Sequence, residues 1–78
     1  MTNLEKYELA FVEAFGVNKE DVPALEYQSI DAWDSVGHME LMANLEDAFD
    51  IMLEMDDIID FAGYEKGKEL LGKYDVEF

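Results

Sequence analysis

With 78 residues, the chain has room for one small hydrophobic core, so we expect residues 1–78 to form a single domain. It has no cysteine, which excludes disulfides and thiolate metal sites and means that any thiol chemistry must come from an attached group. The formal net charge of −15, with only five lysines as basic residues, argues against binding to nucleic acids or to an anionic membrane surface, because both need clustered cations.

Residues 3–15 are predicted to form the first helix. Thr2 or Asn3 can cap its N-terminus, and Gly16 suits the left-handed conformation that often ends a helix. Apolar residues recur between them at near-heptad spacing, as expected of a helix with one buried face: Leu4, Tyr7, Phe11, Ala14 and Phe15.

The connection formed by residues 16–34 is expected to be structured. It contains the only proline of the chain, Pro23, which disfavours helix at Val22. Its apolar residues are too numerous for a disordered linker, and we expect them to anchor the connection to the core: Val17, Val22, Leu25, Tyr27, Ile30 and Trp33.

The second long helix is predicted over residues 35–49. Its apolar surface begins at the first turn and comprises Val36, Met39, Leu41, Met42, Leu45 and Phe49. A short third helix is expected at residues 56–61, with Ile58, Ile59 and Phe61 turned inward.

The last helix is predicted from Tyr64 to about Tyr74, with Leu70 and Leu71 in the core. Lys68 and Lys73 are expected toward its C-terminal end, where cations complement the helix dipole. Two glycines weaken this helix by about 1 kcal/mol each relative to alanine: Gly67 and Gly72. We expect the tail of residues 75–78 to fray.

The predicted fold is all-α: a small bundle of three main helices plus one short helix, with a long structured loop between helices one and two. No alternating strand pattern, internal repeat or glycine-rich phosphate loop appears in the sequence. No apolar run is long enough to span a bilayer, and the acidic N-terminus lacks the basic start and apolar middle of a signal peptide. We therefore expect a cytoplasmic protein, and we expect it to be a monomer.

Ser35 stands where an acidic loop becomes the helix of residues 35–49, directly after Asp34. A hydroxyl at this point lies near the positive end of the helix dipole. It can cap the helix, which stabilises by about 1 kcal/mol, or it can carry a phosphate-linked group whose oxygens face the free amides of the first turn. The position alone favours the cap, which is the commoner use of such a serine.

The sequence around this serine reads Asp34-Ser35-Val36, and it continues with Glu40-Leu41, Leu45-Glu46 and Phe49-Asp50-Ile51. Together with the length and charge, this pattern resembles that of acyl carrier proteins, whose motif is Asp-Ser-Leu. The resemblance covers the chain from Leu4 to Tyr74. The resemblance implies that Ser35 bears 4′-phosphopantetheine, moved from coenzyme A by a phosphopantetheinyl transferase with magnesium. It also implies that Asp34 lies near the metal and the phosphates during that transfer.

In that family, acidic and exposed apolar residues of the second helix meet arginines and lysines of partner enzymes. The matching positions here are Val36, Met39, Glu40, Ala43, Glu46 and Asp47. The charge pattern agrees, because every charged side chain from Glu20 to Glu65 is an Asp or a Glu, so partners with basic docking surfaces should be attracted.

Family members can also open the bundle interior around an acyl chain. The residues that would make such an interior adaptable are Met42, Met52 and Met55.

The chain departs from the commonest form of the family just after the serine. Val36-Gly37 stands where carriers of fatty-acid synthesis have Leu-Asp, so a glycine early in the helix costs stability and one negative charge is missing. Trp33 and the run Gly37-His38-Met39 look more like specialised carriers of surface-polysaccharide, secondary-metabolite or aminoacyl-transfer pathways. The cargo is left open: a fatty acyl, a small acyl or an aminoacyl group.

A carboxylate, a serine and a histidine lie close together in the sequence: Asp34, Ser35 and His38. They do not predict a hydrolase, because the Gly-x-Ser-x-Gly turn is missing and one helical turn cannot align a histidine and a separate buried carboxylate with the hydroxyl. We expect no catalytic residue. His38 is instead expected at the solvent edge, within reach of a phosphate oxygen of the arm or of a partner enzyme.

No metal site is expected. The chain has one histidine and no cysteine, which argues against a transition metal. A calcium loop begun at Asp56 fails, because Ile58 and Phe61 occupy positions that need an oxygen ligand and a glycine.

The sequence therefore predicts a non-catalytic acyl carrier protein. It would hold acyl or aminoacyl intermediates as thioesters on the arm of Ser35 and present them to partner enzymes, which carry out the chemistry. The alternative is an acidic helical protein–protein interaction module that never carries an arm, with Ser35 as a simple cap.

Overall fold

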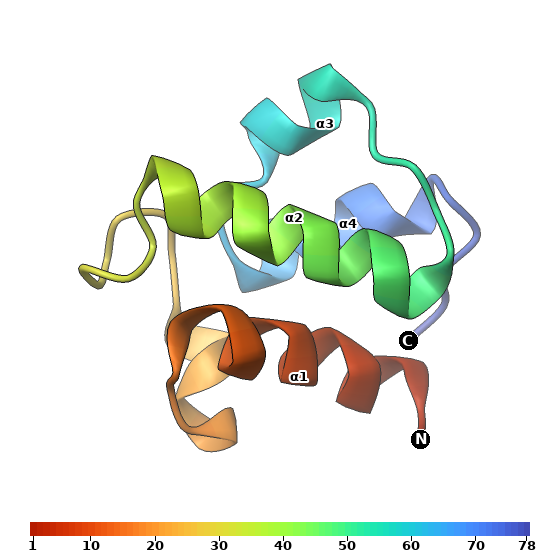
Figure 1. Ribbon diagram of the computed structural model, residues 1–78. Helices are drawn as coiled ribbons and strands as arrows, with labels where there is room; N and C mark the ends of the chain where they lie inside the picture. Colours follow the sequence, from red (N-terminus) through yellow and green to blue (C-terminus); the bar gives the residue numbers. More distant parts are fainter.

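The computed structural model describes residues 1–78 and confirms the all-α fold. Its elements follow in the order α1 (Asn3–Phe15), the 3₁₀ helix η1 (Lys19–Ala24), α2 (Ser35–Phe49), α3 (Met55–Asp60) and α4 (Tyr64–Gly72). Figure 1 shows α1 and α2 side by side, α4 behind α2, and the short α3 at the top. Both termini lie near the C-terminal end of α2 (Figure 1), which leaves the N-terminal end of α2 at the opposite side of the molecule.

The bounds of α1 match the prediction because both of its ends carry strong signals. The Thr2 hydroxyl accepts a hydrogen bond from the Glu5 N–H at 3.1 Å, and the Thr2 N–H donates back to the Glu5 carboxylate at 2.9 Å. These bonds from Thr2 lower the pKa of Glu5. Gly16 ends the helix with a φ of 67°, and its N–H donates to the Val12 carbonyl.

The connection between α1 and α2 is packed against the core, as expected. Three of its predicted anchors are buried and two are half-buried: Val22, Leu25 and Trp33, then Val17 and Ile30. Tyr27 is the exception, because it is exposed, although its ring lies nearly at right angles to those of Trp33 and His38. The sequence did not predict η1, since six residues that include Pro23 show no helical periodicity.

An aromatic cluster fills the centre of the fold. Its rings come from α1, from the connection and from the chain on either side of Gly63: Tyr7, Phe11, Phe15, Trp33, Phe61 and Tyr64. The Tyr7 hydroxyl donates to the Tyr64 carbonyl at 2.6 Å, so this polar group is satisfied in the core, and burial raises the pKa of Tyr7. Burial, together with a 2.8 Å hydrogen bond donated to Glu8, raises the pKa of Tyr64 to about 12.

Gly67 allows α4 to approach this cluster closely. A Cβ at this position would overlap both the Tyr7 hydroxyl and the Phe61 ring. The helix propensity lost at Gly67 is therefore offset by packing that no larger residue permits. Gly72 differs, because nothing lies within 4 Å of its Cβ position.

The inward face of α3 is only partly as predicted. Phe61 is buried and Ile58 is half-buried, but Ile59 is 71 % exposed, so its prediction as a core residue is wrong. Residues three apart share one side of a helix, which brings Ile58 and Phe61 together and turns the intervening Ile59 outward. The expectation of an adaptable methionine interior also fails at two of three positions, because Met52 and Met55 are exposed and only Met42 is buried.

The tail of residues 75–78 was predicted to fray, but in the structure it is held in place. Val76 is buried, and the Asn3 side chain donates to the Glu77 carbonyl at 2.9 Å. The Phe78 ring lies 5.1 Å from that of Tyr7 and 6.3 Å from that of Phe49. The tail is thus held by buried Val76 and by the Asn3–Glu77 hydrogen bond, and Phe78 reaches rings of α1 and α2 while staying 46 % exposed.

The prediction that Lys68 and Lys73 lie toward the C-terminal end of α4 is confirmed for Lys73, which is the C-terminal cap, whereas Lys68 lies in the middle of the helix. Both of these lysines pair with carboxylates. The helix ends at Gly72, so Lys73 lies beyond it and pairs with Asp57 of α3. Lys68 pairs with Glu65 at 3.4 Å, and its ammonium lies 4.9 Å from the centre of the Tyr64 ring.

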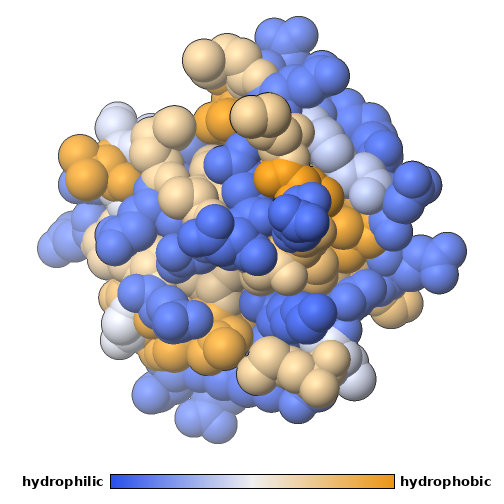
Figure 2. All heavy atoms as spheres, turned by 45° about the vertical axis from the view of Figure 1, so that its right-hand side comes forward, coloured by the Kyte–Doolittle hydropathy of each residue, from blue (hydrophilic) through white to orange (hydrophobic).

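Hydrophilic side chains cover much of the face seen in Figure 2, with hydrophobic side chains between them. No helix is both long and apolar enough to cross a lipid bilayer.

Candidate functional site

Ser35 is the first residue of α2, and its side chain is exposed. The cap of this helix is Asp34, whose Oδ1 accepts a hydrogen bond from the Gly37 N–H at 2.8 Å. The interpretation of Ser35 as the capping side chain is therefore wrong, because its neighbour already fills that role. The hydroxyl of Ser35 stays free for another use.

The first turn of α2 also retains uncommitted backbone donors. The Gly37 N–H is used by the Asp34 side chain, and the His38 N–H donates to the Asp34 carbonyl at 2.8 Å. The N–H groups of Ser35 and Val36 make no backbone or side-chain hydrogen bond. Two donors at the positive end of the helix dipole thus lie beside the free hydroxyl, an arrangement that favours an anionic group.

Gly37 lets the preceding loop lie directly on the helix. A Cβ at this position would overlap the Ala32 carbonyl oxygen and would lie 3.2 Å from the Phe15 ring. From the sequence, Gly37 was expected only to lower the stability of the helix. In the structure, its missing side chain also allows a close backbone contact where the chain enters α2.

His38 is buried, at 8 % exposure, so its prediction as a solvent-edge residue is wrong. Its Nδ1 accepts a hydrogen bond from the Trp33 indole N–H at 2.9 Å, and its Nε2 lies 2.7 Å from the Ile58 carbonyl oxygen. Because an indole N–H can only donate, the imidazole proton sits on Nε2 and is donated to Ile58. Neither ring nitrogen is free for a phosphate oxygen. The signal was in the spacing, because His38 precedes Leu41, Met42 and Leu45 by three, four and seven residues.

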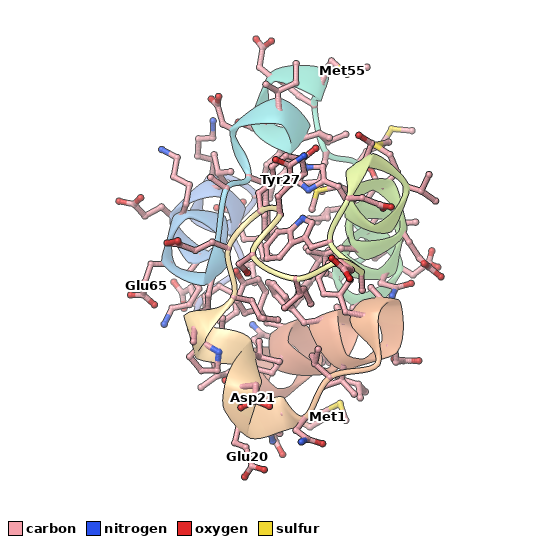
Figure 3. All side chains as sticks on the ribbon, turned by 90° about the vertical axis from the view of Figure 1, so that its left-hand side faces the viewer. Met1, Glu20, Asp21, Tyr27, Met55 and Glu65 are labelled. Carbon is pink, nitrogen blue, oxygen red and sulfur yellow. The ribbon has the colours of Figure 1, made fainter.

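A groove lies between the N-terminal half of α2, the helix α3 and Tyr27 of the connection. It measures about 390 Å³, and its walls are apolar apart from His38: Tyr27, His38, Met39, Met55, Ile58, Ile59, Phe61 and Ala62. Figure 3 views the molecule from the side at which α2 begins and shows Tyr27 on the connection, below α3, which carries Met55. Met39 follows Ser35 by four residues, so the groove starts one helical turn from the hydroxyl. The sequence did not predict this groove, which depends on how α3 is placed.

A clasp of four residues holds the outer wall of the groove. Asp57 of α3 is buried and accepts hydrogen bonds from the Lys73 ammonium and the Tyr74 hydroxyl, both at 2.5 Å. The Tyr74 oxygen in turn accepts the Glu54 N–H at 2.9 Å, at the start of α3. The contacts with Lys73 and Tyr74 hold the pKa of Asp57 below its usual range. Polar contacts thus tie α3 to the chain that follows α4.

Most of the predicted partner-binding residues share one exposed face of α2. Val36 and Met39 are 77 % and 53 % exposed, so two apolar side chains stand together in solvent. Glu40, Ala43 and Asp47 are also exposed and continue the same face at helical spacing. Glu46 lies at the border of this face and is half-buried, and its Oε2 is engaged by the Leu53 N–H at 2.8 Å.

No three histidine, cysteine or acidic side chains gather closely enough to hold a metal ion. Of the three residues predicted at the prosthetic group, Asp34 and Ser35 lie together at the helix start, whereas His38 faces the core behind them. No family model matches the chain, and neither a curated protein nor a solved structure matches it.

Proposed function

We propose that this protein is an acyl carrier that bears 4′-phosphopantetheine on Ser35 and works in the cytoplasm, where coenzyme A supplies the arm. The observation that carries the proposal is the pairing of Asp34 and Ser35. Because Asp34 supplies the cap of α2, the serine hydroxyl makes no hydrogen bond and is exposed at the first residue of the helix. The sequence resemblance around Asp34-Ser35-Val36 supports the same use.

The residues present fit a phosphodiester at this position. The unpaired N–H groups of Ser35 and Val36 can donate to its oxygens, and the helix dipole favours its negative charge. Attachment forms a bond between Ser35 Oγ and phosphorus, breaks the pyrophosphate bond of coenzyme A, and releases the 3′,5′-bisphosphate nucleotide. The serine proton passes to a base of the transferase. The arm supplies the thiol that this cysteine-free chain lacks.

The surroundings of Ser35 support a role in presenting cargo. Val36 and Met39 are exposed beside carboxylates, which suits a docking surface for enzymes that offer apolar patches rimmed by arginine and lysine. The apolar groove one turn away could shelter an acyl group from water between encounters. The chemical steps on that acyl group would belong to the partner enzymes.

The alternative function, an acidic interaction module without an arm, draws on the same exposed face. It would use Val36, Met39 and Glu40 to bind a basic partner and would have no need of a free hydroxyl. The two functions differ in whether Ser35 is ever modified, so one measurement separates them.

The test is intact mass after incubation of the folded protein with coenzyme A, magnesium and a promiscuous phosphopantetheinyl transferase. We expect one phosphopantetheine adduct, which Ser35→Ala abolishes. The matched control is Ser29→Ala, which removes the only other serine, a loop residue whose Oγ accepts the Glu26 N–H at 3.0 Å. This variant should load like the wild type. An unmodified wild type would favour the interaction module, and an adduct that survives Ser35→Ala would refute the assigned position.

A further inference from the structure

The backbone on either side of Ser35 is tied together by three hydrogen bonds. Two come from the helix cap: Gly37 N–H to the Asp34 carboxylate, and His38 N–H to the Asp34 carbonyl, both at 2.8 Å. The third joins side chains, from the Trp33 indole to the imidazole of His38 at 2.9 Å. Ser35 therefore lies in the middle of a closed loop of contacts, with Trp33 two residues before it and His38 three residues after it.

His38 extends this loop of contacts to α3. Its Nε2–H donates to the Ile58 carbonyl at 2.7 Å, so one imidazole joins the chain before the serine, the first turn of α2 and the end of α3. The hydrogen-bonded imidazole and indole rings lie nearly coplanar, side by side, with centroids 6.1 Å apart and planes 19° apart. Tyr27 and Phe61 meet it edge-on at 5.2 Å and 6.2 Å. Rings on three sides and hydrogen bonds at both nitrogens leave the imidazole one orientation.

The connection before Ser35 depends on this pair for its placement. Trp33 is fully buried, and its indole N–H finds its partner in His38. Losing that acceptor would leave a buried donor unsatisfied, which the loop could relieve by moving the indole outward. Because Trp33 is separated from Ser35 by Asp34 alone, such a movement would carry the cap and the hydroxyl with it.

We propose that His38 is a positioning residue for the modification of Ser35. It accepts the Trp33 indole N–H and thereby holds the serine hydroxyl in the direction that attack on the phosphorus of coenzyme A requires. It touches neither the hydroxyl nor the phosphate. This inference rests on the proposed function, because it concerns the reaction that loads the arm. The physical basis is that correct orientation of a nucleophile contributes strongly to rate, and a displacement of about 1 Å can cost about 100-fold.

Three variants separate the two hydrogen bonds of His38. Asn places an oxygen where Nδ1 lies, so His38→Asn keeps an acceptor for Trp33 and loses the donor to Ile58. Gln places a nitrogen where Nε2 lies, so His38→Gln keeps the donor and loses the acceptor. Trp33→Phe keeps an aromatic ring in the core and removes the indole N–H. All three are compared below their melting temperatures, with circular dichroism as the check on folding.

The decisive readout is the single-turnover rate of phosphopantetheine transfer at saturating transferase, with the half-saturating transferase concentration measured separately. We expect His38→Gln and Trp33→Phe to load about tenfold more slowly, and His38→Asn to load within about twofold of the wild type. Half-saturation should change little, because the exposed face of Val36 and Met39 is intact. A merely structural role would lower melting temperatures and leave these rates equal.

Nitrogen NMR of the imidazole provides a test that needs no transferase. We expect Nε2 to carry the proton and Nδ1 to be an acceptor; a proton on Nδ1 would overturn the inference. Wild-type rates in both His38→Gln and Trp33→Phe would also overturn it while leaving the proposed function standing. A wild-type chain that is never modified would overturn both.

Discussion

Gly37 shows how a residue can lower local helix propensity and still be the best choice for its position. Alanine would raise the propensity of α2 by about 1 kcal/mol. Its Cβ, however, would meet the Ala32 carbonyl oxygen, a backbone atom that cannot turn aside as a flexible side chain can. The conflict therefore falls on the loop that leads into Ser35.

We predict that Gly37→Ala destabilises the fold by about 2 kcal/mol, measured by urea denaturation, because overpacking exceeds the gain in helix propensity. The matched control is Gly72→Ala at the end of α4, where nothing lies within 4 Å of the Cβ position. This control should be neutral or stabilised by up to about 1 kcal/mol. Equal effects of the two substitutions would show that the contact with Ala32 is unimportant.

At the scale of single elements, α3 stands apart because it is short and is held by polar contacts at both ends. His38 donates to the Ile58 carbonyl in its last turn, and the clasp of Glu54, Asp57, Lys73 and Tyr74 holds its start. The lowered pKa of Asp57 means that the folded state favours its ionised form. The contribution of the clasp to the stability of the folded state is therefore complete at pH values above the ordinary pKa of aspartate, about 3.9. It is lost as the pH falls through the lowered pKa of Asp57.

The alkaline limit of the same clasp follows from its other members. The hydrogen bond to Asp57 raises the pKa of Lys73, whereas burial, aided by the hydrogen bond to Asp57, raises that of Tyr74. The contribution of Lys73 and Tyr74 to the stability of the folded state is present at pH values below the ordinary pKa values of lysine and tyrosine. It disappears as the pH rises through the raised pKa values of these two residues.

We predict that Asp57→Asn destabilises the protein at pH 7 and that the difference from the wild type shrinks as the pH falls below about 4. The quantity to compare at each pH is the difference in unfolding free energy between Asp57→Asn and the wild type, because protonation of other carboxylates changes the stability of both proteins. Asp56→Asn is the control, since Asp56 is an exposed neighbour in the same helix. A pH-independent difference at Asp57 would mean that its charge does not support the clasp.

The helices were predictable where a long periodic pattern carried its own end signals. α1 begins and ends as expected because its caps and its apolar spacing agree over thirteen residues. α2 has its predicted bounds through apolar spacing over fifteen residues, although its cap is Asp34 and not Ser35. η1 was missed, and Ile59 of α3 was misplaced, because such short segments take their orientation from the rest of the fold.

The candidate site was predictable only in part. The place of Ser35 follows from the helix start, but the choice of Asp34 as the cap depends on atomic positions. His38 was predicted at the solvent edge near the arm, after a hydrolase arrangement with the serine had been rejected. Its spacing from Leu41 and Leu45 placed it on the buried face, and its partners Trp33 and Ile58 come from segments whose packing the sequence does not reveal.

At the scale of the whole molecule, charge opposes compactness. A net charge of −15 is confined to a chain whose radius of gyration is 11.1 Å. Carboxylates at such separations repel one another through water, and salt weakens this repulsion because the screening length is about 10 Å at 0.1 M. The same field would attract partners with basic docking surfaces.

We predict that moderate sodium chloride, or a lower concentration of magnesium chloride, raises the melting temperature by relieving this self-repulsion. Thermal denaturation followed by circular dichroism across a salt series is the measurement. A melting temperature that does not change with salt would show that the charges are already accommodated in the fold.

The most direct test of the account is the state of Ser35 in protein isolated from the cells that make it. Top-down mass spectrometry gives both the mass of the intact chain and the position of any added group. We predict a phosphopantetheine arm on Ser35 in at least part of the material, with Ser29 unmodified. A folded chain without any arm, which also resists loading by promiscuous transferases, would contradict the proposal that this protein is a carrier.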